Sequence, residues 1–282
     1  MPRSQSNTSD KPSRISAVLT IAGSDPSGGA GIQADLKTFT ATGVYGAAVI
    51  TALTAQNTLT VSAAMAIPAD FVKQQLDAVL SDIRIDVIKL GMLPTPEICE
   101  TIAPYLDKYP VVCDPVMIST SGCSLIDDPA ISALATHIIP RSDFITPNLN
   151  ELEILCVEKI HTMKDILAAG MDLMTRFPRL SGAVLKGGHW NTDSRTVTDT
   201  LLLKEDGRVN AYFETNTRYH TKNTHGTGCT FASAFAAFLA KKKPPFEAFS
   251  KAVTFTSRLI ELSKDSPVGQ GNGPLLHHCS GD

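Results

Sequence analysis

Short, nearly continuous apolar runs alternate with helix-length segments over most of this chain. Runs such as ISAVLTIAG at 15–23 and GAVLKGG at 182–188 are too short for buried helices, and both end in glycine. Strands that are apolar on both faces belong to parallel sheets that helices cover on both sides. The alternation therefore predicts an α/β fold with a mostly parallel central sheet and helices on both faces.

The same pattern predicts the individual elements and the domain organisation. No long linker and no internal repeat interrupts it, so we expect a single domain at 15–270, preceded by a disordered polar segment at 1–14 and followed by a tail at 271–282. The residues Asp206-Gly207 are typical of a hairpin turn within a β-rich segment at 197–216. Strands are expected at 15–23, 47–57, 59–67, 86–91, 111–116, 143–148 and 182–188, and helices at 29–43, 68–83, 95–106, 127–138, 149–156, 162–176, 226–241 and 245–264.

Charge and cysteine content exclude several classes of partner. The formal net charge is −3, and the only lysine run, at 241–243, closes an expected helix, so we expect no nucleic-acid partner. No apolar run is long enough to span a bilayer and no secretory signal is visible, so we expect no membrane partner and a cytoplasmic location. The six cysteines form no C-x-x-C pair and no metal-ligand cluster, which favours free thiols in a reducing compartment.

Unusual residue clusters follow the ends of the expected strands. Ligands of such sheets bind at the carboxyl ends of the strands, which meet at one edge. The sequence therefore predicts one composite site at that edge. The clusters are Gly23–Gly31, Gln56–Asn57, Gly91–Met92, Asp114–Met117, Pro147–Glu151, Lys186–His189 and Thr224–Cys229.

Three of these clusters have a structural and a functional interpretation that sequence alone leaves open. The glycine-rich AGSDPSGGAGIQAD at 22–35 lacks the ending of a P-loop and the spacing of a dinucleotide fold, so it is either a permissive turn or an anion-binding loop. Asn148 and Glu151 have capping-box spacing, but the carboxylate would also suit a magnesium-bound triphosphate. Lys186 ends a strand before two glycines, where it is either solvated or the countercharge of an anion.

The segment HGTGC at 225–229 is the most informative cluster. Gly226 and Gly228 bracket a turn before a helix, and free amides at a helix start bind anions. The same positive end stabilises a thiolate, so we expect a lowered pKa for Cys229. A packing role is the alternative, but Cys229 lies on the polar side of the boundary, whereas Cys113 lies within an apolar run. We therefore interpret Cys229 as a catalytic group.

Taken in order, these motifs resemble the hydroxymethylpyrimidine/phosphomethylpyrimidine kinases of thiamine biosynthesis, within the ribokinase-like superfamily. The first block and HGTGC are highly specific, and the resemblance covers most of the chain. It implies a ribokinase-like fold, a homodimer, and ATP- and Mg²⁺-dependent phosphorylation of a pyrimidine alcohol and then of its monophosphate. The matching segments are GSDPSGGAGIQADLKTF (23–39), VITALTAQNT (49–58), KLGML (89–93), DPVM (114–117), TPNLNE (146–151), LKGGH (185–189), TKNTHGTGCTFASA (221–234) and GNGP (271–274).

The resemblance also implies roles for individual residues. A carboxylate and an amide suit the amino group and ring nitrogens of an aminopyrimidine. Glu151 would hold Mg²⁺ through water, with Asp114 as a secondary metal ligand, and Cys229 would be the base. The pyrimidine is implied near Gly23, Asp35, Gln56, Met92 and Val116; ATP near Asp114, Asn148, Glu151, Lys186 and Thr224; and the anion hole and catalytic groups at Gly226, Thr227, Gly228, Cys229 and Lys186.

Three other functions stay open at this point. A pyridoxal kinase of the same superfamily also binds a ring nitrogen and a hydroxymethyl group, although Asp35 and Gln56 favour an aminopyrimidine. A catalytically silent ligand-binding relative would keep the fold without turnover. A redox-sensing role of Cys229 is the third, but no resolving cysteine lies nearby in sequence.

Overall fold

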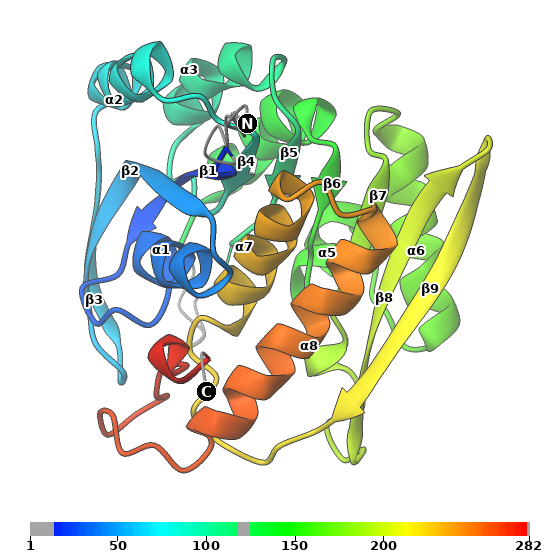
Figure 1. The fold of residues 1–282 in the computed structure, drawn as a ribbon. Helices are drawn as coiled ribbons and strands as arrows, with labels where there is room; N and C mark the ends of the chain where they lie inside the picture. Colours follow the sequence, from blue (N-terminus) through cyan, green and yellow to red (C-terminus); the bar gives the residue numbers. More distant parts are fainter. Residues whose placement is uncertain (1–13, 118–124, 281–282) are drawn as a thin grey trace, which may run out of the picture.

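A mostly parallel nine-stranded sheet forms the centre of the computed structural model, which describes residues 14–117 and 125–280 (Figure 1). The strand order is β3-β2-β1-β4-β5-β6-β7-β8-β9; β3, β8 and β9 run antiparallel to their neighbours. This confirms the predicted fold class, whereas the segment expected to be disordered lies almost wholly outside the described residues. The strands are β1 (Ala17–Ser24), β2 (Tyr45–Gln56), β3 (Val61–Ala66), β4 (Val87–Leu90), β5 (Val111–Cys113), β6 (Phe144–Ile145), β7 (Gly182–Leu185), β8 (Thr196–Glu205) and β9 (Arg208–Thr217).

Helices cover both faces of the sheet. Successive side chains of β1 point to opposite faces, so that Leu19 packs into the core on one side and Val18 into the core on the other. Helices α1, α7 and α8 cover the Val18 side and α2 to α6 the Leu19 side (Figure 1). Their bounds are α1 (Gly31–Ala41), α2 (Ala69–Asp82), α3 (Pro96–Leu106), α4 (Asp128–Ala133), α5 (Leu149–Cys156), α6 (Met163–Arg176), α7 (Thr227–Ala240) and α8 (Pro245–Ser263).

The structure differs from the expected elements in two places. The helix expected at 127–138 keeps α-helical geometry only as far as Ala133 and then widens into a π-helical turn at Leu134–Ile138. Pro140 follows; it has no N–H to donate, and its ring crowds the carbonyl four residues earlier. Strands β5, β6 and β7 also end sooner than expected, because residues after them leave the sheet and line a cavity.

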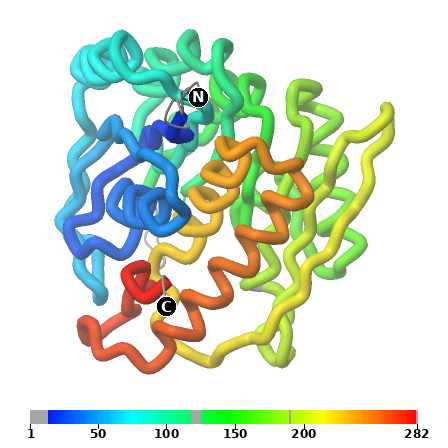
Figure 2. The backbone as a smooth tube through the Cα atoms, viewed as in Figure 1, coloured from blue at the N-terminus to red at the C-terminus, as the bar shows by residue number. Residues whose placement is uncertain are grey.

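The segment expected as a C-terminal tail packs against the domain through residue 280. Asn272 N–H donates to the Thr58 carbonyl at 2.8 Å, and His225 N–H donates to the Gly273 carbonyl at 3.0 Å. Figure 2 shows this segment, in red, beside α1. The end of the chain therefore closes one side of the fold.

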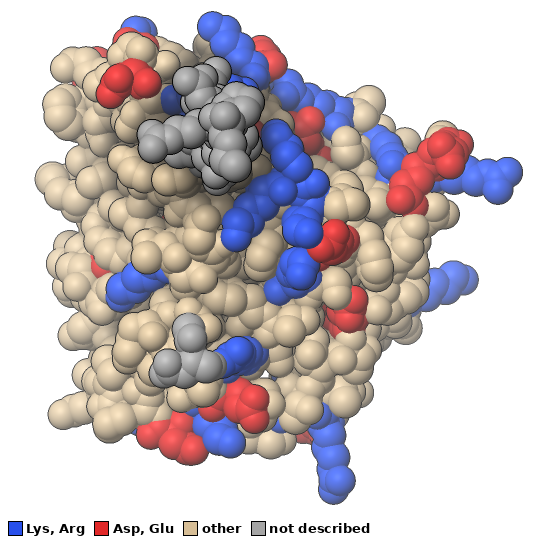
Figure 3. All heavy atoms as spheres, viewed as in Figure 1, with Lys and Arg blue, Asp and Glu red and all other residues tan. Residues whose placement is uncertain are grey.

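The surface carries charges of both signs. On the face in Figure 3, lysines and arginines gather near the top, with acidic side chains beside them. Within the described part of the chain, no helix combines the length and the apolar character that crossing a membrane requires.

Candidate active site

A cavity of about 540 Å³ opens where the parallel strands end at their carboxyl side. This is a volume typical of small-molecule sites. The structure brings together every site residue expected from the sequence except Asp35. The expected residues that line the cavity are Gly23, Gln56, Met92, Asp114, Val116, Asn148, Glu151, Lys186, Thr224, Gly226, Thr227, Gly228 and Cys229.

The start of α7 borders the cavity with the backbone of Gly226 and Gly228, while the Thr227 N–H between them donates to the Thr224 carbonyl at 3.2 Å. Gly226 has φ +79°, and a Cβ at this position would lie 1.8 Å from the Gly29 carbonyl oxygen, so only glycine fits. Cys229 lies in the first turn of α7, and the Gly31 N–H at the start of α1 acts to lower the pKa of its thiol. Two helix N-termini therefore meet at Cys229, which favours an anion there.

The protonation state of Cys229 differs from the expectation. Burial raises the pKa of its thiol to about 11, and the Lys89 ammonium acts against this rise, while Asp35 and Asp114 add to it. In the ligand-free protein the thiol is therefore neutral near pH 7. The expectation of a lowered pKa was wrong. It considered the favourable field at the helix start but not the loss of water around the thiol, which disfavours the thiolate.

Asp35 lies behind the cavity wall. It is fully buried on α1, and its two carboxylate oxygens lie 2.9 and 3.0 Å from the Lys89 Nζ. The hydroxyls of Thr20 and Ser233 each donate to Asp35 at 2.6 Å. Lys89 itself lines the cavity. The geometry thus makes Asp35 the anchor of a buried lysine, in place of the direct pyrimidine contact expected from the sequence.

Lys89 was missed by the sequence reasoning, although its motif was noted. It stands in the middle of a short apolar strand, where a charge must have a partner. Burial disfavours its ammonium form, but the Asp35 carboxylate raises the pKa of Lys89 above its ordinary value. A lysine inside a buried strand was the signal that such a partner exists.

A second charged group lies on the other side of Cys229. The Lys186 Nζ is 2.8 Å from Asp114 and 3.8 Å from Glu151. Burial acts to raise the pKa of Asp114, but the Lys186 and Lys89 ammonium groups hold it below its ordinary value. Burial raises the pKa of Glu151 to about 7, which Lys186 opposes and the Asp114 carboxylate reinforces. This end of the cavity therefore has one buried lysine between two carboxyl groups.

The capping box at α5 is present, and its members also line the cavity. Asn148 Oδ1 accepts from the Glu151 N–H at 3.0 Å, and Glu151 Oε2 accepts from the Asn148 N–H at 2.7 Å. The two interpretations of this motif are therefore compatible. The cap fixes the Glu151 carboxylate at the cavity edge.

The side chains around Lys186 fit a magnesium-bound polyphosphate. Glu151 and Asp114 offer the hard oxygen donors that Mg²⁺ prefers. A Cβ on Gly228 would lie 3.3 Å from the Lys186 Nζ, so glycine leaves this ammonium accessible from the helix start. Among residues 14–117 and 125–280, no cluster of three or more histidine, cysteine or acidic side chains could hold a metal. Mg²⁺ would therefore need water and phosphate oxygens as its further ligands.

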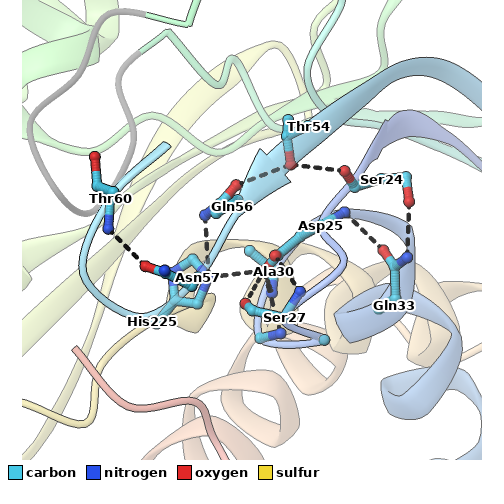
Figure 4. Close-up of polar contacts among 12 residues, drawn as sticks. Ser24, Asp25, Ser27, Ala30, Gln33, Thr54, Gln56, Asn57, Thr60 and His225 are labelled. Atoms are coloured by element: carbon cyan, nitrogen blue, oxygen red, sulfur yellow. Dashed lines mark hydrogen bonds and ion pairs between the residues drawn. The ribbon is translucent and has the colours of Figure 1, made fainter. Parts of the chain in front are cut away.

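Sequence reasoning also missed two groups of residues that border the cavity. Arg218 donates to the Gly188 carbonyl at 2.9 Å, and Asp199 accepts from the Gly187 N–H at 2.8 Å. Both come from the β8–β9 hairpin, whose sequence carries no motif. The second group is the pair Asp25 and His225, joined at 2.8 Å (Figure 4). Both lay within motifs that were noted, but neither was given a role.

Comparisons with known proteins show which family this chain resembles. The model of the phosphomethylpyrimidine kinase family matches residues 25–276. The hydroxymethylpyrimidine/phosphomethylpyrimidine kinase of Staphylococcus aureus (strain MRSA252) is 42% identical, and the match covers 92% of each chain. The bifunctional thiamine biosynthesis protein ThiED of Geobacter sulfurreducens is 44% identical over 93% of this chain, which spans about half (52%) of that protein's length. The structure of the Staphylococcus aureus pyridoxal kinase with AMP-PCP and pyridoxal superposes with a TM-score of 0.80 at 33% identity, covering 94% of each chain.

Proposed function

Because the chain belongs to the phosphomethylpyrimidine kinase family, we propose that it phosphorylates hydroxymethylpyrimidine with ATP and then phosphorylates the resulting monophosphate. One observation carries the proposal. Helix α7 packs across the middle of the sheet, against β1, β4 and β5, so Cys229 at its start lies between two sets of cavity residues. The first set is Gln56 and Met92, at the ends of β2 and β4, and the second is Lys186 and Glu151, beyond the ends of β7 and β6. The first set suits a flat heterocycle and the second a polyphosphate.

The pyrimidine side combines an amide with apolar walls. The Gln56 amide can pair with a ring nitrogen and an amino group, while Met92 and Val116 offer apolar contact surface. We assign Asp35 an indirect role, which is to hold the Lys89 ammonium at the cavity wall through the contacts at 2.9 and 3.0 Å.

The phosphate side neutralises and orients the transferring group. The amides of Gly226 and Gly228 would face a developing negative charge, and Lys186 would add a positive one. When bound through Glu151 and water, Mg²⁺ supplies further charge neutralisation for the nucleotide oxygens. Phosphoryl transfer chiefly needs such positioning and charge, so this set of groups is sufficient for the chemistry.

Cys229 takes the proton in the first step. As the substrate hydroxyl oxygen bonds to the phosphorus and ADP leaves, the hydroxyl proton passes to the thiolate. Only the minor thiolate form can accept it, since the thiol has a pKa of about 11 in the ligand-free protein. In the second step the nucleophile is a phosphate oxygen that is already largely ionised near pH 7.

An ADP-release assay with three acceptors tests the proposal. We expect turnover of hydroxymethylpyrimidine and of its monophosphate, with pyridoxal as the slower acceptor. Turnover of pyridoxal alone would replace the proposal by a pyridoxal kinase, the function named for the S. aureus structure. Binding of both ligands by calorimetry without ADP release would make the chain a silent relative.

We further propose a homodimer in the cytoplasm. Large apolar side chains remain exposed near the β3 edge of the sheet, and Leu53 and Met65, which are 41% and 59% exposed, are direct cross-strand partners there. Exposed apolar surface of this kind favours association. Sedimentation equilibrium should give twice the monomer mass, and a monomer at micromolar concentration would contradict the proposal.

A further inference from the structure

The Asp25 carboxylate is surrounded by hydrogen-bond donors (Figure 4). It accepts from the Ser27 N–H at 2.8 Å, the Ser27 hydroxyl at 2.9 Å and the Ala30 N–H at 2.8 Å, and it lies 2.8 Å from His225 Nε2. Burial acts to raise the pKa of Asp25, but the hydrogen bonds from His225, Ser27 and Ala30 lower it to about 2. An ionised carboxylate only accepts hydrogen bonds, so His225 Nε2 must carry a proton.

The His225 ring packs against a neighbouring backbone, and the backbone of His225 is itself anchored. A Cβ on Gly29 would lie 2.2 Å from the His225 ring, so the ring packs directly on the Gly29 backbone. The backbone N–H of His225 donates to the Gly273 carbonyl at 3.0 Å, and His225 is 4% exposed. The proton on Nε2 therefore points in a fixed direction.

The Gln56 amide lies against this fixed donor. One end of the amide is 3.3 Å from His225 Nε2, and the other is 3.2 Å from the Thr54 hydroxyl, which also donates to the Ser24 carbonyl at 3.0 Å. The two ends have the same shape, so the hydrogen-bond network decides their identity. If the NH₂ group lay toward His225, it would face the protonated Nε2, which is also a donor. The amide oxygen would then lie toward Thr54, and the hydroxyl would need one proton for this oxygen and a second for the Ser24 carbonyl. With oxygen toward His225 and NH₂ toward Thr54, the single Nε2 proton is shared between Asp25 and the amide oxygen, and the Thr54 hydroxyl accepts from the NH₂ while it donates to Ser24.

We propose that His225, locked by Asp25, holds the Gln56 amide with its oxygen toward His225 and so fixes which substrate edge the cavity accepts. The inference rests on the proposed function and adds a specificity-determining role to His225 and Asp25. The substrate's amino group then pairs with the amide oxygen on the His225 side, and its ring nitrogen accepts from the NH₂ on the Thr54 side. A 4-oxo analogue would place its carbonyl oxygen against the amide oxygen and its ring N–H against the NH₂ group. Acceptor would then face acceptor and donor would face donor, so the fixed amide rejects this analogue.

The discrimination between these two acceptors tests the inference. We expect the wild-type protein to prefer the 4-amino over the 4-oxo acceptor by at least roughly 100-fold in kcat/KM, since the wrong edge leaves buried polar groups unpaired. In His225→Phe the amide is free to turn, so the preference should fall below about tenfold. The exposed His161, replaced in His161→Phe, is the matched control and should keep the wild-type ratio. An unchanged ratio in His225→Phe overturns the inference.

A second measurement needs neither turnover nor a variant that folds. Long-range ¹H–¹⁵N correlation spectra of the ligand-free protein report which ring nitrogen of His225 is protonated. We expect a protonated Nε2 from pH 6 to 8, and an unprotonated Nε2 overturns the inference. If the wild-type protein phosphorylates neither acceptor, the proposed function fails, while the spectrum still decides the state of His225.

Discussion

Cys229 lies between opposing influences on its charge. Two helix N-termini and Lys89 favour a thiolate, whereas burial and two carboxylates favour the neutral thiol. If the thiolate is the base, Cys229→Ala should slow the alcohol step by roughly 10²–10⁴-fold and the monophosphate step far less. Single-turnover rates of both steps on the variant measure this. Equal losses would leave Cys229 a positioning role only.

The pH dependence of the alcohol step follows from the raised thiol pKa. With a pKa of about 11, the thiolate fraction rises about tenfold for each pH unit between 7 and 10. The alcohol step should therefore accelerate over this range in the wild-type protein. In Cys229→Ala it should not, and the monophosphate step should stay nearly flat in both. A flat wild-type profile would contradict proton transfer to this thiol.

A variant of Lys89 also tests which influences set the pKa of Cys229. Lys89→Met removes the main influence that lowers the Cys229 pKa, so the thiolate should form only at still higher pH. The rate of iodoacetamide labelling at Cys229, followed by mass spectrometry across pH, measures the shift. The single variant also leaves Asp35 buried without its counter-ion, at a cost of about 3–5 kcal/mol. The double variant Asp35→Asn with Lys89→Met should recover part of this stability and only part of the labelling profile, because Lys89 lowers the Cys229 pKa by more than Asp35 raises it.

The junction before α7 depends on glycine for two separable reasons. Gly226 and Gly207 share a left-handed backbone, with φ +79° and +77°, but only Gly226 has a carbonyl where a Cβ would lie. Gly207→Ala in the β8–β9 turn should therefore cost only about 1 kcal/mol of backbone strain. Gly226→Ala should move the loop at 29–31 and lower both phosphorylation steps. Urea unfolding and the two-step assay compare the variants, and equal effects would discount the contact with Gly29.

At the level of elements, the periodicity of apolar residues predicted nearly all of the helices and strands. The hairpin turn and α5 were predicted from local patterns, and both are present. The failures have local causes that periodicity does not carry. The helix that begins with α4 ends in a π-helical turn before Pro140. Strands β5 and β6 stop early because Asp114 and Asn148, which follow them, turn toward the cavity.

The candidate site was predictable as a set of strand ends but not as a set of contacts. Lys89 and Asp35 are 54 residues apart, and Asp25 and His225 are 200 residues apart, so no spacing reveals either pair. The structure places Asp35 behind the cavity wall as the partner of Lys89, and it places His225 against Asp25. Burial, which sets the thiol pKa of Cys229, is likewise a property of the whole fold.

The C-terminal segment shows how the whole molecule supports the site. Residues 271–280 join Thr58 after β2 to the junction before α7, through Asn272 and Gly273. His277, 4% exposed, lies 2.9 Å from the Thr230 hydroxyl, next to Cys229. Removing this segment would take away the acceptor of the His225 backbone N–H and the partner of the Thr230 hydroxyl.

Truncation after residue 270 should therefore lower stability and activity together. We expect the loss of these buried hydrogen bonds to reduce the melting temperature by several degrees, since about 1 kcal/mol shifts a protein of this size by roughly 2–4 °C. Removal of residues 281–282 alone is the control and should change neither property. Thermal unfolding and the ADP-release assay measure both. If the longer truncation kept wild-type stability and rates, the contacts of this segment would support neither the fold nor the site.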